Sequence, residues 1–319
     1  VNRNIRKEIK MKIHSTLSSF FIGVMSLTSF NLQSAEMHTF ENKFGKVEVP
    51  VEPQCVISLH DFSLTIQLFE LGVRPCGSVA RKKLWSEPFF RGVQHRFNTE
   101  DLAYVGSHKS PDEEAISLLA PDLIVGLYYQ EKMKSKLSHI APTVILPTKD
   151  ESVKEWASQL ADLVGKTAQF QDQQAEYNWI ISEFKRLVPD HAKITVTTLE
   201  IYEDNFQLIG RGGLDEVIAD MGLSRPKGYA DAKKGISYSL ERISDMDADI
   251  IIDTYEPLLD SRKSTKKFRD SVQWKNLFAV KNNQFLYFNR SRYGDSMGGL
   301  IGSAYLLLSH IAEREFQRQ

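Results

Sequence analysis

Cysteine is scarce in this sequence: Cys55 and Cys76 are the only two. They form no C-x-x-C pair, which argues against dithiol redox catalysis and against a zinc ribbon. In an oxidising compartment an isolated pair can be joined as a disulfide. Two small buried hydrophobic side chains are the equally open alternative.

Motifs that carry catalysis or bind nucleotides are also missing. The sequence has no P-loop, no G-x-S-x-G elbow and no G-x-G-x-x-G fingerprint. The glycine-rich stretch 210–213 precedes an expected helix, and it is interpreted as a tight turn in preference to an anion site. The chain is therefore not expected to be an enzyme. An exported α/β enzyme with an unrecognised active site remains the alternative from another class.

Histidine occurs eight times, but it never clusters as H-x-H, H-E-x-x-H or a histidine-rich tract. This spacing argues against a carrier that ligates a bare zinc or manganese ion. We therefore predict no direct metal site and no resident cofactor.

Long apolar runs are absent beyond a short one near the N-terminus. Lys7, Lys10 and Lys12 precede an apolar run over 17–27 that is too short to span a bilayer, and small residues follow at Ser34 and Ala35. This order predicts a signal peptide over residues 1–35, cleaved near Ala35. No cysteine lies at that point, so we expect an exported, soluble, periplasmic protein without a lipid anchor.

Charge is balanced, with 40 Lys and Arg against 41 Asp and Glu and a formal net charge of −1. Nothing in this balance points to nucleic acid or to insertion into a membrane. The 319 residues are 42% hydrophobic, which is ordinary for a globular protein and enough for two α/β lobes.

Strand-like and helix-like segments alternate along most of the chain. Short β-branched runs such as 55–59, 122–126 and 143–146 are separated by segments with helical spacing, and the alternation resumes after residue 189. This alternation predicts mainly parallel sheets covered by helices. We place a helix N-terminus at Ser110, with Pro111 in its first turn.

Residues 151–188 differ, because apolar side chains recur there with near-helical spacing and Pro189 ends the pattern. We predict one long helix, bent near Gly165. The expected organisation is an N-terminal lobe over 36–150, a linking helix over 151–188 and a C-terminal lobe over 189–319.

This order of segments resembles the substrate-binding proteins of siderophore and cobalamin ABC importers. These are class III binding proteins, in which a single long helix joins two α/β lobes. The likeness runs from about residue 53 to 313, nearly all of the chain after the leader. The segments that carry it are 56–59, 71–73, 105–107, 120–124, 140–143, 239–243 and 274–282. The resemblance implies a binding protein that delivers a small ligand to the membrane subunits of an ABC importer, and we expect it to act as a monomer.

Within that family the sequence is most similar to ferric-hydroxamate binding proteins. The aromatic loop 83–88, the pair Tyr128–Tyr129 and the stretch 291–294 fall where that group contacts its ligand. Two departures stand out. His108 replaces a ligand-contacting arginine, and Ser291 or Arg292 replaces a tryptophan. Both changes argue against a neutral tri-hydroxamate as the ligand.

A ferric siderophore carries iron that is already saturated with oxygen ligands, so its binding protein needs aromatic walls and cationic donors in place of metal ligands. Loops expected at strand ends supply such a basic and aromatic set, with Lys233 and Lys234 as weaker members. The candidate ligand-binding residues are Arg81, Trp85, His108, Tyr128, Tyr129, Arg211, Tyr255, Arg290, Arg292 and Tyr293. This set favours an anionic complex, a hydroxamate or citrate-hydroxamate before a catecholate. Haem or cobalamin is the alternative ligand on the same fold.

Glu114 and Glu241 each fall in the first turn of an expected helix, one in each lobe. The resemblance implies that they dock onto arginines of the importer. Compensation of the helix dipole is the simpler alternative, and both roles are compatible.

Overall fold

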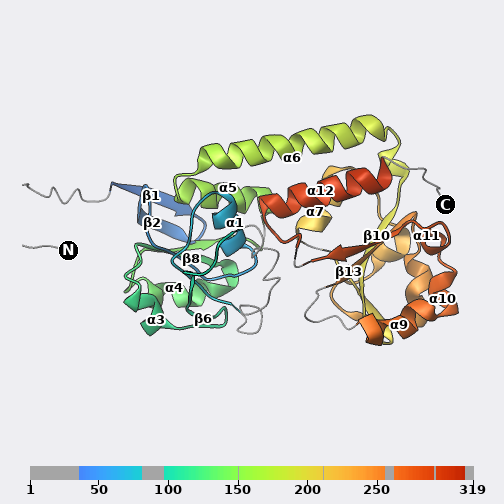
Figure 1. Cartoon of the computed structure of the whole chain (residues 1–319), viewed down its shortest axis with the longest axis horizontal. Helices are drawn as coiled ribbons and strands as arrows, with labels where there is room; N and C mark the ends of the chain where they lie inside the picture. Colours follow the sequence, from blue (N-terminus) through green and yellow to red (C-terminus); the bar gives the residue numbers. More distant parts are fainter. Residues whose placement is uncertain are drawn as a thin grey trace, which may run out of the picture. The chain divides into compact units, whose positions relative to one another are not determined.

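The computed structural model describes residues 36–80, 97–149, 151–210, 212–255, 262–290 and 292–312, all within one compact unit from Ala35 to the C-terminus (Figure 1). The predicted signal peptide over 1–35 lies outside these residues. So do the candidate residues Arg81, Trp85 and Arg211. None of the helices in these ranges is long and apolar enough to cross a membrane.

The N-terminal lobe contains a five-stranded, fully parallel sheet in the order β5-β4-β3-β8-β9. Its strands are β3 (Val56–Ser58), β4 (Gly77–Ser78), β5 (Ala103–Tyr104), β8 (Leu123–Leu127) and β9 (Thr143–Leu146). Two small antiparallel pairs accompany it: β1 (Met37–Asn42) with β2 (Gly45–Pro50), and β6 (Gly106–Ser107) with β7 (Ser110–Pro111). The buried strands β8 and β9 read as continuous apolar runs, as expected for a sheet covered on both faces.

The C-terminal lobe contains a second five-stranded sheet, in the order β12-β11-β10-β13-β14. Its strands are β10 (Val196–Ile201), β11 (Asn205–Leu208), β12 (Ser237–Ser239), β13 (Ile250–Tyr255) and β14 (Phe285–Asn289). The strands β10, β13 and β14 are parallel, whereas β10, β11 and β12 form an antiparallel meander. The sheet is therefore mixed, because only a short turn separates β10 from β11 and leaves no room for a crossover helix.

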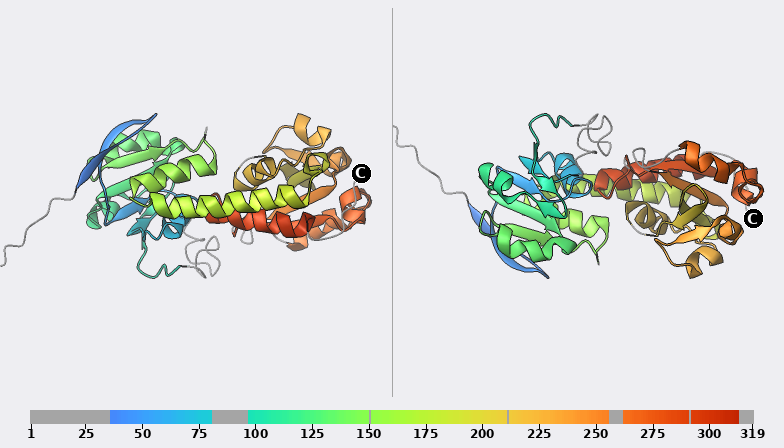
Figure 2. Two further views of the ribbon diagram at one scale, coloured as in Figure 1. Left: turned by 90° about the horizontal axis from the view of Figure 1, so that it is seen from above. Right: turned by 90° about the horizontal axis from the view of Figure 1, so that it is seen from below.

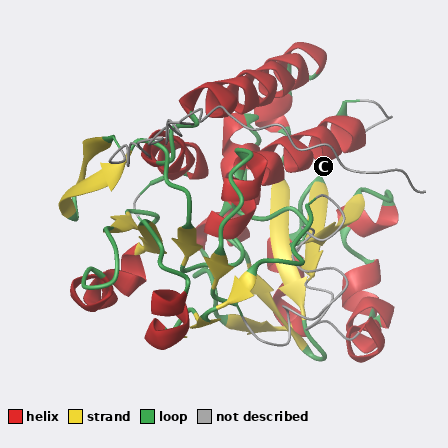
Figure 3. Ribbon diagram, turned by 60° about the vertical axis from the view of Figure 1, so that its left-hand side comes forward, coloured by secondary structure: helices red, strands yellow, loops and turns green. Residues whose placement is uncertain are grey.

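Helices flank the strands of both sheets, as Figure 3 shows with helices in red and strands in yellow. In the N-terminal lobe they are α1 (Leu64–Glu70), α3 (Glu113–Leu118), α4 (Glu131–Leu137) and the 3-10 turn η2 (Tyr128–Gln130). In the C-terminal lobe they are α7 (Gly213–Asp220), α8 (Lys227–Asp231), α9 (Arg262–Asp270), α10 (Val272–Lys275), α11 (Phe278–Lys281), α12 (Met297–Ile311) and the 3-10 turns η3 (His191–Lys193) and η4 (Leu240–Met246). The α/β class expected from the sequence is confirmed.

The helix predicted over 151–188 is two helices, α5 (Val153–Leu163) and α6 (Thr167–Leu187). The chain breaks between them because Gly165 has a φ of +67°, a conformation that glycine adopts readily. A Cβ at this position would lie 2.8 Å from the carbonyl oxygen of Val51. The predicted bend is thus a true interruption of the helix.

The helix start predicted at Ser110 is wrong. Ser110 and Pro111 belong to strand β7, and α3 is capped by Asp112, whose side chain accepts a hydrogen bond of 3.0 Å from the backbone N–H of Ala115. Aspartate is as good a cap as serine, and it leaves the preceding residues free to pair with β6.

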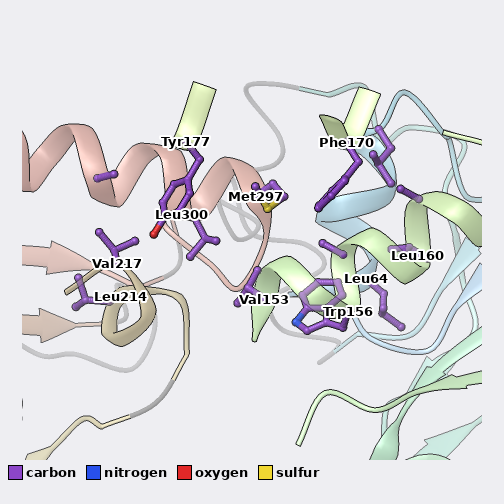
Figure 4. Close-up of a cluster of buried hydrophobic side chains, with 14 of the residues drawn as sticks. Leu64, Val153, Trp156, Leu160, Phe170, Tyr177, Leu214, Val217, Met297 and Leu300 are labelled. Carbon is purple, nitrogen blue, oxygen red and sulfur yellow. The ribbon is translucent and has the colours of Figure 1, made fainter. Parts of the chain in front are cut away.

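One buried apolar cluster joins elements of both lobes (Figure 4). Trp156 and Leu160 of α5, Tyr177 of α6, and Met297 and Leu300 of α12 all belong to it. The helices α6 and α12 pack side by side, as Figure 2 shows from two sides. The helices that connect the lobes are therefore held by core packing.

Polar contacts reinforce this packing where α1 meets the start of α12. The side-chain oxygen of Gln67 accepts from the N–H of Met297 at 2.8 Å, and the Glu70 carboxylate accepts from the N–H of Gly298 at 2.9 Å. Gln173 of α6 donates to the carbonyl oxygen of Glu70 at 2.9 Å. A helix of the N-terminal lobe thus caps the unsatisfied first turn of a helix that packs on the other lobe.

Candidate ligand-binding site

Parallel strands bring their carboxyl ends to one edge of a sheet, and ligands of α/β proteins bind at that edge. In the N-terminal lobe β3 runs into His60 and Asp61, β6 into His108, and β8 into Tyr128 and Tyr129. The structure therefore brings together the predicted residues His108, Tyr128 and Tyr129. It adds His60 and Asp61, and we call these five residues the N-lobe cluster.

Aromatic rings line the N-lobe cluster at contact distances. The ring centroids of His60 and His108 are 6.1 Å apart, those of His60 and Tyr129 6.3 Å, and those of Tyr128 and Tyr129 5.4 Å. All three pairs meet edge to face, the arrangement that aromatic quadrupoles favour. Tyr129 remains 42% exposed, so its ring is available to a bound molecule.

Gln130, which is fully buried, holds the loops of the N-lobe cluster in place. Its amide nitrogen donates to the carbonyl oxygens of Leu59 at 2.8 Å and His108 at 3.0 Å, and its oxygen accepts from the N–H of Leu127 at 2.9 Å. One side chain thereby ties together the ends of β3, β6 and β8. Gln130 was not predicted, because glutamine after a tyrosine pair is not a known motif.

The N-lobe cluster contains one buried carboxylate, that of Asp61. Asp61 is 2% exposed, and its Oδ2 atom is buried without a hydrogen-bond partner among the residues that the structure describes. Burial of the Tyr129 hydroxyl raises the pKa of Tyr129 well above the usual range, and the negative charges of Asp61 and Tyr128 raise it further. Tyr129 is therefore a neutral hydrogen-bonding group at physiological pH.

In the C-terminal lobe the carboxyl ends of β10, β13 and β14 carry a second set, the C-lobe cluster of Glu200, Tyr202, Tyr255, Arg290 and Arg292. The backbone N–H of Arg290 donates to the carbonyl oxygen of Tyr255 at 2.9 Å, which fixes the two predicted residues next to each other. Glu200 and Tyr202 were not predicted. Their only signal was their place at and just after the end of an expected strand.

The two arginines of the C-lobe cluster differ in their availability. The Nη2 atom of Arg290 lies 2.8 and 2.9 Å from the two carboxylate oxygens of Glu200, which is nearly buried. Arg292 is exposed and forms no ion pair with the described residues. Burial and the Glu200 charge raise the pKa of Tyr202 to about 12. Of the two arginines, Arg292 is thus the more exposed.

Tyr293 and the pair Lys233–Lys234 were also predicted to contact the ligand, but they are not part of the C-lobe cluster. The ring of Tyr293 packs 5.1 Å from that of Phe288 and is only partly exposed. The ammonium group of Lys234 donates to the carbonyl oxygens of Tyr229 and Ala232 and lies 3.9 Å from the Tyr229 ring, while Lys233 is exposed. The ammonium group of Lys234 thus makes its contacts within its own loop.

Cys55 and Cys76 form a disulfide. The alternative of two separate buried side chains is therefore wrong. They precede β3 and β4, so the crosslink lies at the amino edge of the sheet, opposite the N-lobe cluster. It therefore stabilises the sheet without contacting the candidate site.

Glu114 and Glu241 are both exposed, in the first turns of α3 and η4. A hydrogen bond from the Ser239 side chain lowers the pKa of Glu241. Both residues thus lie in a first helical turn, as compensation of the helix dipole requires, and are exposed, as docking requires.

Direct ligation of a metal ion finds no support in the described ranges, where no three His, Cys, Asp or Glu side chains are placed to share an ion.

Comparison with known proteins identifies the class. Residues 85–290 match the family described as "Periplasmic binding protein", and the chain belongs to that family. Its fold is that of class III binding proteins, and its relatives are binding proteins, not enzymes.

Two relatives come from Bacillus subtilis. The chain is 28% identical to "Probable siderophore-binding lipoprotein YfiY" over 93% of this chain and 97% of that protein. It is 30% identical to "Iron(3+)-hydroxamate-binding protein YxeB" over 79% of this chain and 78% of that protein. Among solved structures, Staphylococcus aureus SirA complexed with staphyloferrin B is 27% identical. It superimposes with a TM-score of 0.70 over 86% of this chain and 97% of SirA.

Proposed function

We propose that the protein captures a ferric siderophore outside the cytoplasm and delivers it to an ABC importer. The observation that carries this proposal is the pair of clusters at the carboxyl edges of the two sheets, aromatic in the N-lobe cluster and cationic at Arg292 in the C-lobe cluster. The siderophore binding and ferric-hydroxamate binding for which these relatives are named support it.

The chemistry of the clusters fits a ligand whose iron is already coordinated. Tyrosine and histidine rings present broad apolar surfaces to an organic backbone, and arginine pairs with carboxylate or hydroxamate oxygens. No step requires the protein to bind iron itself. We favour a hydroxamate or citrate-hydroxamate, with a catecholate next, because Arg292 and the neutral tyrosines suit oxygen-rich anions.

Delivery to the importer is proposed to use the exposed carboxylates Glu114 and Glu241, one on each lobe. A leader over residues 1–35, removed near Ala35, would place the protein where an importer needs it. Replacing both glutamates by glutamine should abolish uptake in cells while leaving ligand affinity unchanged. Loss of affinity in this variant would show that the residues serve the fold or the site instead.

The proposal is tested by titrating the protein with ferric staphyloferrin B, a ferric hydroxamate and a ferric catecholate, and by following quenching of tryptophan and tyrosine fluorescence. We expect sub-micromolar binding of at least one complex and none of a simple iron salt.

Haem and cobalamin are the matched controls, because the same fold can hold a flat or macrocyclic ligand and both absorb visible light. Tight binding of haem with an intense Soret band, and no response to any siderophore, would retain the binding-protein fold and overturn the siderophore proposal.

A further inference from the structure

Helix α7 carries two acidic side chains on one face and contains no basic residue that could neutralise them. Glu216 and Asp220 are four residues apart, and like charges at this spacing destabilise a helix. Asp220 is also the last residue of α7, where the helix dipole disfavours a negative charge. A cation from another part of the fold is therefore needed to offset both charges.

Lys154, at the start of α5, supplies this cation. Its Nζ atom lies 2.5 Å from Oδ2 of Asp220 and 3.6 Å from Oε1 of Glu216. The backbone N–H of Val153 donates to Oε2 of Glu216 at 2.7 Å. The hydroxyl of Tyr177 in α6 donates to Oδ2 of Asp220 at 2.7 Å. Val153 and Tyr177 are labelled in Figure 4. Three helices thus meet at the side chains of Lys154, Tyr177, Glu216 and Asp220, which we call the interlobe cluster.

The charges of the interlobe cluster are largely shielded from water. The side chain of Glu216 is 13% exposed and that of Lys154 is 26% exposed. Salt screens partly buried pairs much less than exposed ones, and the loss of one partner leaves the other charge without compensation in a poorly hydrated place. The interlobe cluster should therefore contribute more than an exposed pair such as Lys136 with Glu113.

The interlobe cluster connects the two lobes. Helix α5 packs against β9 and α1 of the N-terminal lobe, whereas α7 packs against α12 of the C-terminal lobe. The N–H of Gly213, the first residue of α7, donates to Oδ1 of Asp295 at 2.8 Å. Asp295 follows Arg292 of the C-lobe cluster by three residues. A continuous series of contacts therefore runs from Lys154 through α7 to the loop that carries Arg292.

Water can reach the ammonium group of Lys154 from one side. A cavity of about 470 Å³ lies there, lined by Glu151, Lys154, Glu155, Ser158, Gln159 and Gln174. Water in this cavity can replace the carboxylates as hydrogen-bond partners of Lys154, so the ion pairs can break and form again.

We propose that Lys154 is a latch between the lobes. Its ion pairs with Glu216 and Asp220 hold α7, and with it the C-lobe cluster, in a fixed orientation relative to the N-lobe cluster before any ligand binds. When these ion pairs break, both carboxylates regain water and the lobes move apart. The inference goes beyond the proposed function, because it concerns the protein without a ligand.

The test measures the distance between the lobes in the ligand-free protein by double electron–electron resonance. Spin labels are attached to Lys132→Cys in α4 and Gln273→Cys in α10, which are both exposed positions. The native cysteines do not compete for the label, because they are joined in the disulfide. The labelled parent protein should give one narrow distance distribution. Lys154→Met should move about a tenth or more of the molecules to a longer distance, because it removes the cation that favours the joined state.

Lys136→Met is the matched control, since its ion pair with Glu113 lies wholly within the N-terminal lobe, and it should leave the distribution unchanged. Asp220→Asn keeps the shape of the side chain and should produce the same longer distance, so the test still has a result if Lys154→Met does not fold.

The charge-swapped variant Lys154→Glu/Asp220→Lys should restore the single narrow distribution. It re-forms the ion pair with reversed polarity, and both new charges suit the dipoles of their helices, an acid in the first turn of α5 and a base in the last turn of α7.

A single narrow distribution in Lys154→Met or, if that variant does not fold, in Asp220→Asn would overturn the inference and show that apolar packing alone joins the lobes. An equal shift in Lys136→Met, or a longer distance that persists in the charge-swapped variant, would overturn it as well. These outcomes are independent of siderophore binding, since no ligand is present. Conversely, a protein that binds no siderophore could still show the latch.

Discussion

At the scale of single residues, the two arginines of the C-lobe cluster illustrate how one residue type serves two purposes. Arg290 neutralises Glu200, whereas Arg292 is exposed and unpaired among the described residues. Both arginines were predicted to contact the ligand. The sequence does not show which of the two will pair with a buried carboxylate, because that carboxylate lies on a strand far away in the sequence.

Replacing these arginines by alanine should therefore have different consequences. Arg292→Ala should weaken binding of an anionic ferric siderophore about tenfold with little change in stability, since it removes a charge-assisted contact. Arg290→Ala should lower the free energy of unfolding by about 1–3 kcal/mol, because it leaves the buried Glu200 carboxylate without its counter-ion. Urea denaturation would measure the stability of both variants, and calorimetric titration their affinity for the ligand. The same loss of stability in both variants would contradict the structural role of Arg290 and the ligand-binding role of Arg292.

At the scale of elements, the junction between α1 and α12 determines how firmly the two lobes are joined. Gln67 is fully buried and bonds to the first N–H of α12 and to Gln173 of α6, so it touches the two helices that link the lobes. A rigid junction fits a binding protein in which the lobes move little when the ligand binds.

Gln67→Ala should release this junction. We expect a loss of about 1–2 kcal/mol in unfolding free energy from the orphaned N–H of Met297, and faster hydrogen exchange at the amides of 297–299. Gln207→Ala, which removes a bond to Ser237 within the C-terminal lobe, is the control and should leave exchange at 297–299 unchanged. Unchanged exchange in Gln67→Ala would show that apolar packing alone holds the junction.

The break between α5 and α6 gives a second prediction at this scale. Gly165→Ala should destabilise the protein by at least about 1 kcal/mol, because alanine is strained at a φ of +67° and its Cβ would crowd the carbonyl oxygen of Val51. Thermal melts of this variant and of Gly235→Ala, a positive-φ glycine with open space around it, would separate the clash from the backbone strain. Equal losses would mean that the contact with Val51 contributes nothing.

Helices and strands could be predicted where residues close together in the sequence determine them, and not where pairing with a distant segment does. Strand β9 matched its expected range of 143–146, because a run of buried β-branched and apolar residues is a local signal. Strand β7 and the true cap at Asp112 were missed, since a two-residue strand is decided by pairing with β6. Three of the five residues of the N-lobe cluster, His108, Tyr128 and Tyr129, were predicted from the resemblance. His60 and Asp61 were not, because their place beside these residues is set by the fold and has no local sequence signature.

At the scale of the whole molecule, the disulfide and the site occupy opposite edges of the N-terminal sheet. Replacing Cys55 and Cys76 together by serine should lower the unfolding free energy by about 3 kcal/mol, the value expected for a loop of this length. Ligand affinity at 25 °C should not change. A parallel loss of affinity would show that the crosslink positions the loops of the N-lobe cluster as well.

Stability should also fall in alkaline solution. The pKa values of Tyr202 and Tyr229 are raised to about 12, for both chiefly by burial, so the folded state keeps these phenols protonated where the unfolded chain ionises near pH 10. Their contribution is complete below pH 10 and is lost as the pH rises toward 12. Urea denaturation at pH 8, 10 and 11 should show this decline, and Tyr202→Phe should make it shallower. A slope that is the same in both proteins would exclude Tyr202 as a source.

The central claim is that the two clusters hold one intact ferric siderophore. Native mass spectrometry of the protein mixed with ferric staphyloferrin B and with ferric hydroxamates tests it most directly, with Tyr129→Ala/Arg292→Ala as the comparison. The account predicts one complex per chain with its iron retained, and at least a tenfold weaker complex in the double variant. Retention of bare iron, or a complex that the double variant holds as well as the wild type does, would contradict it.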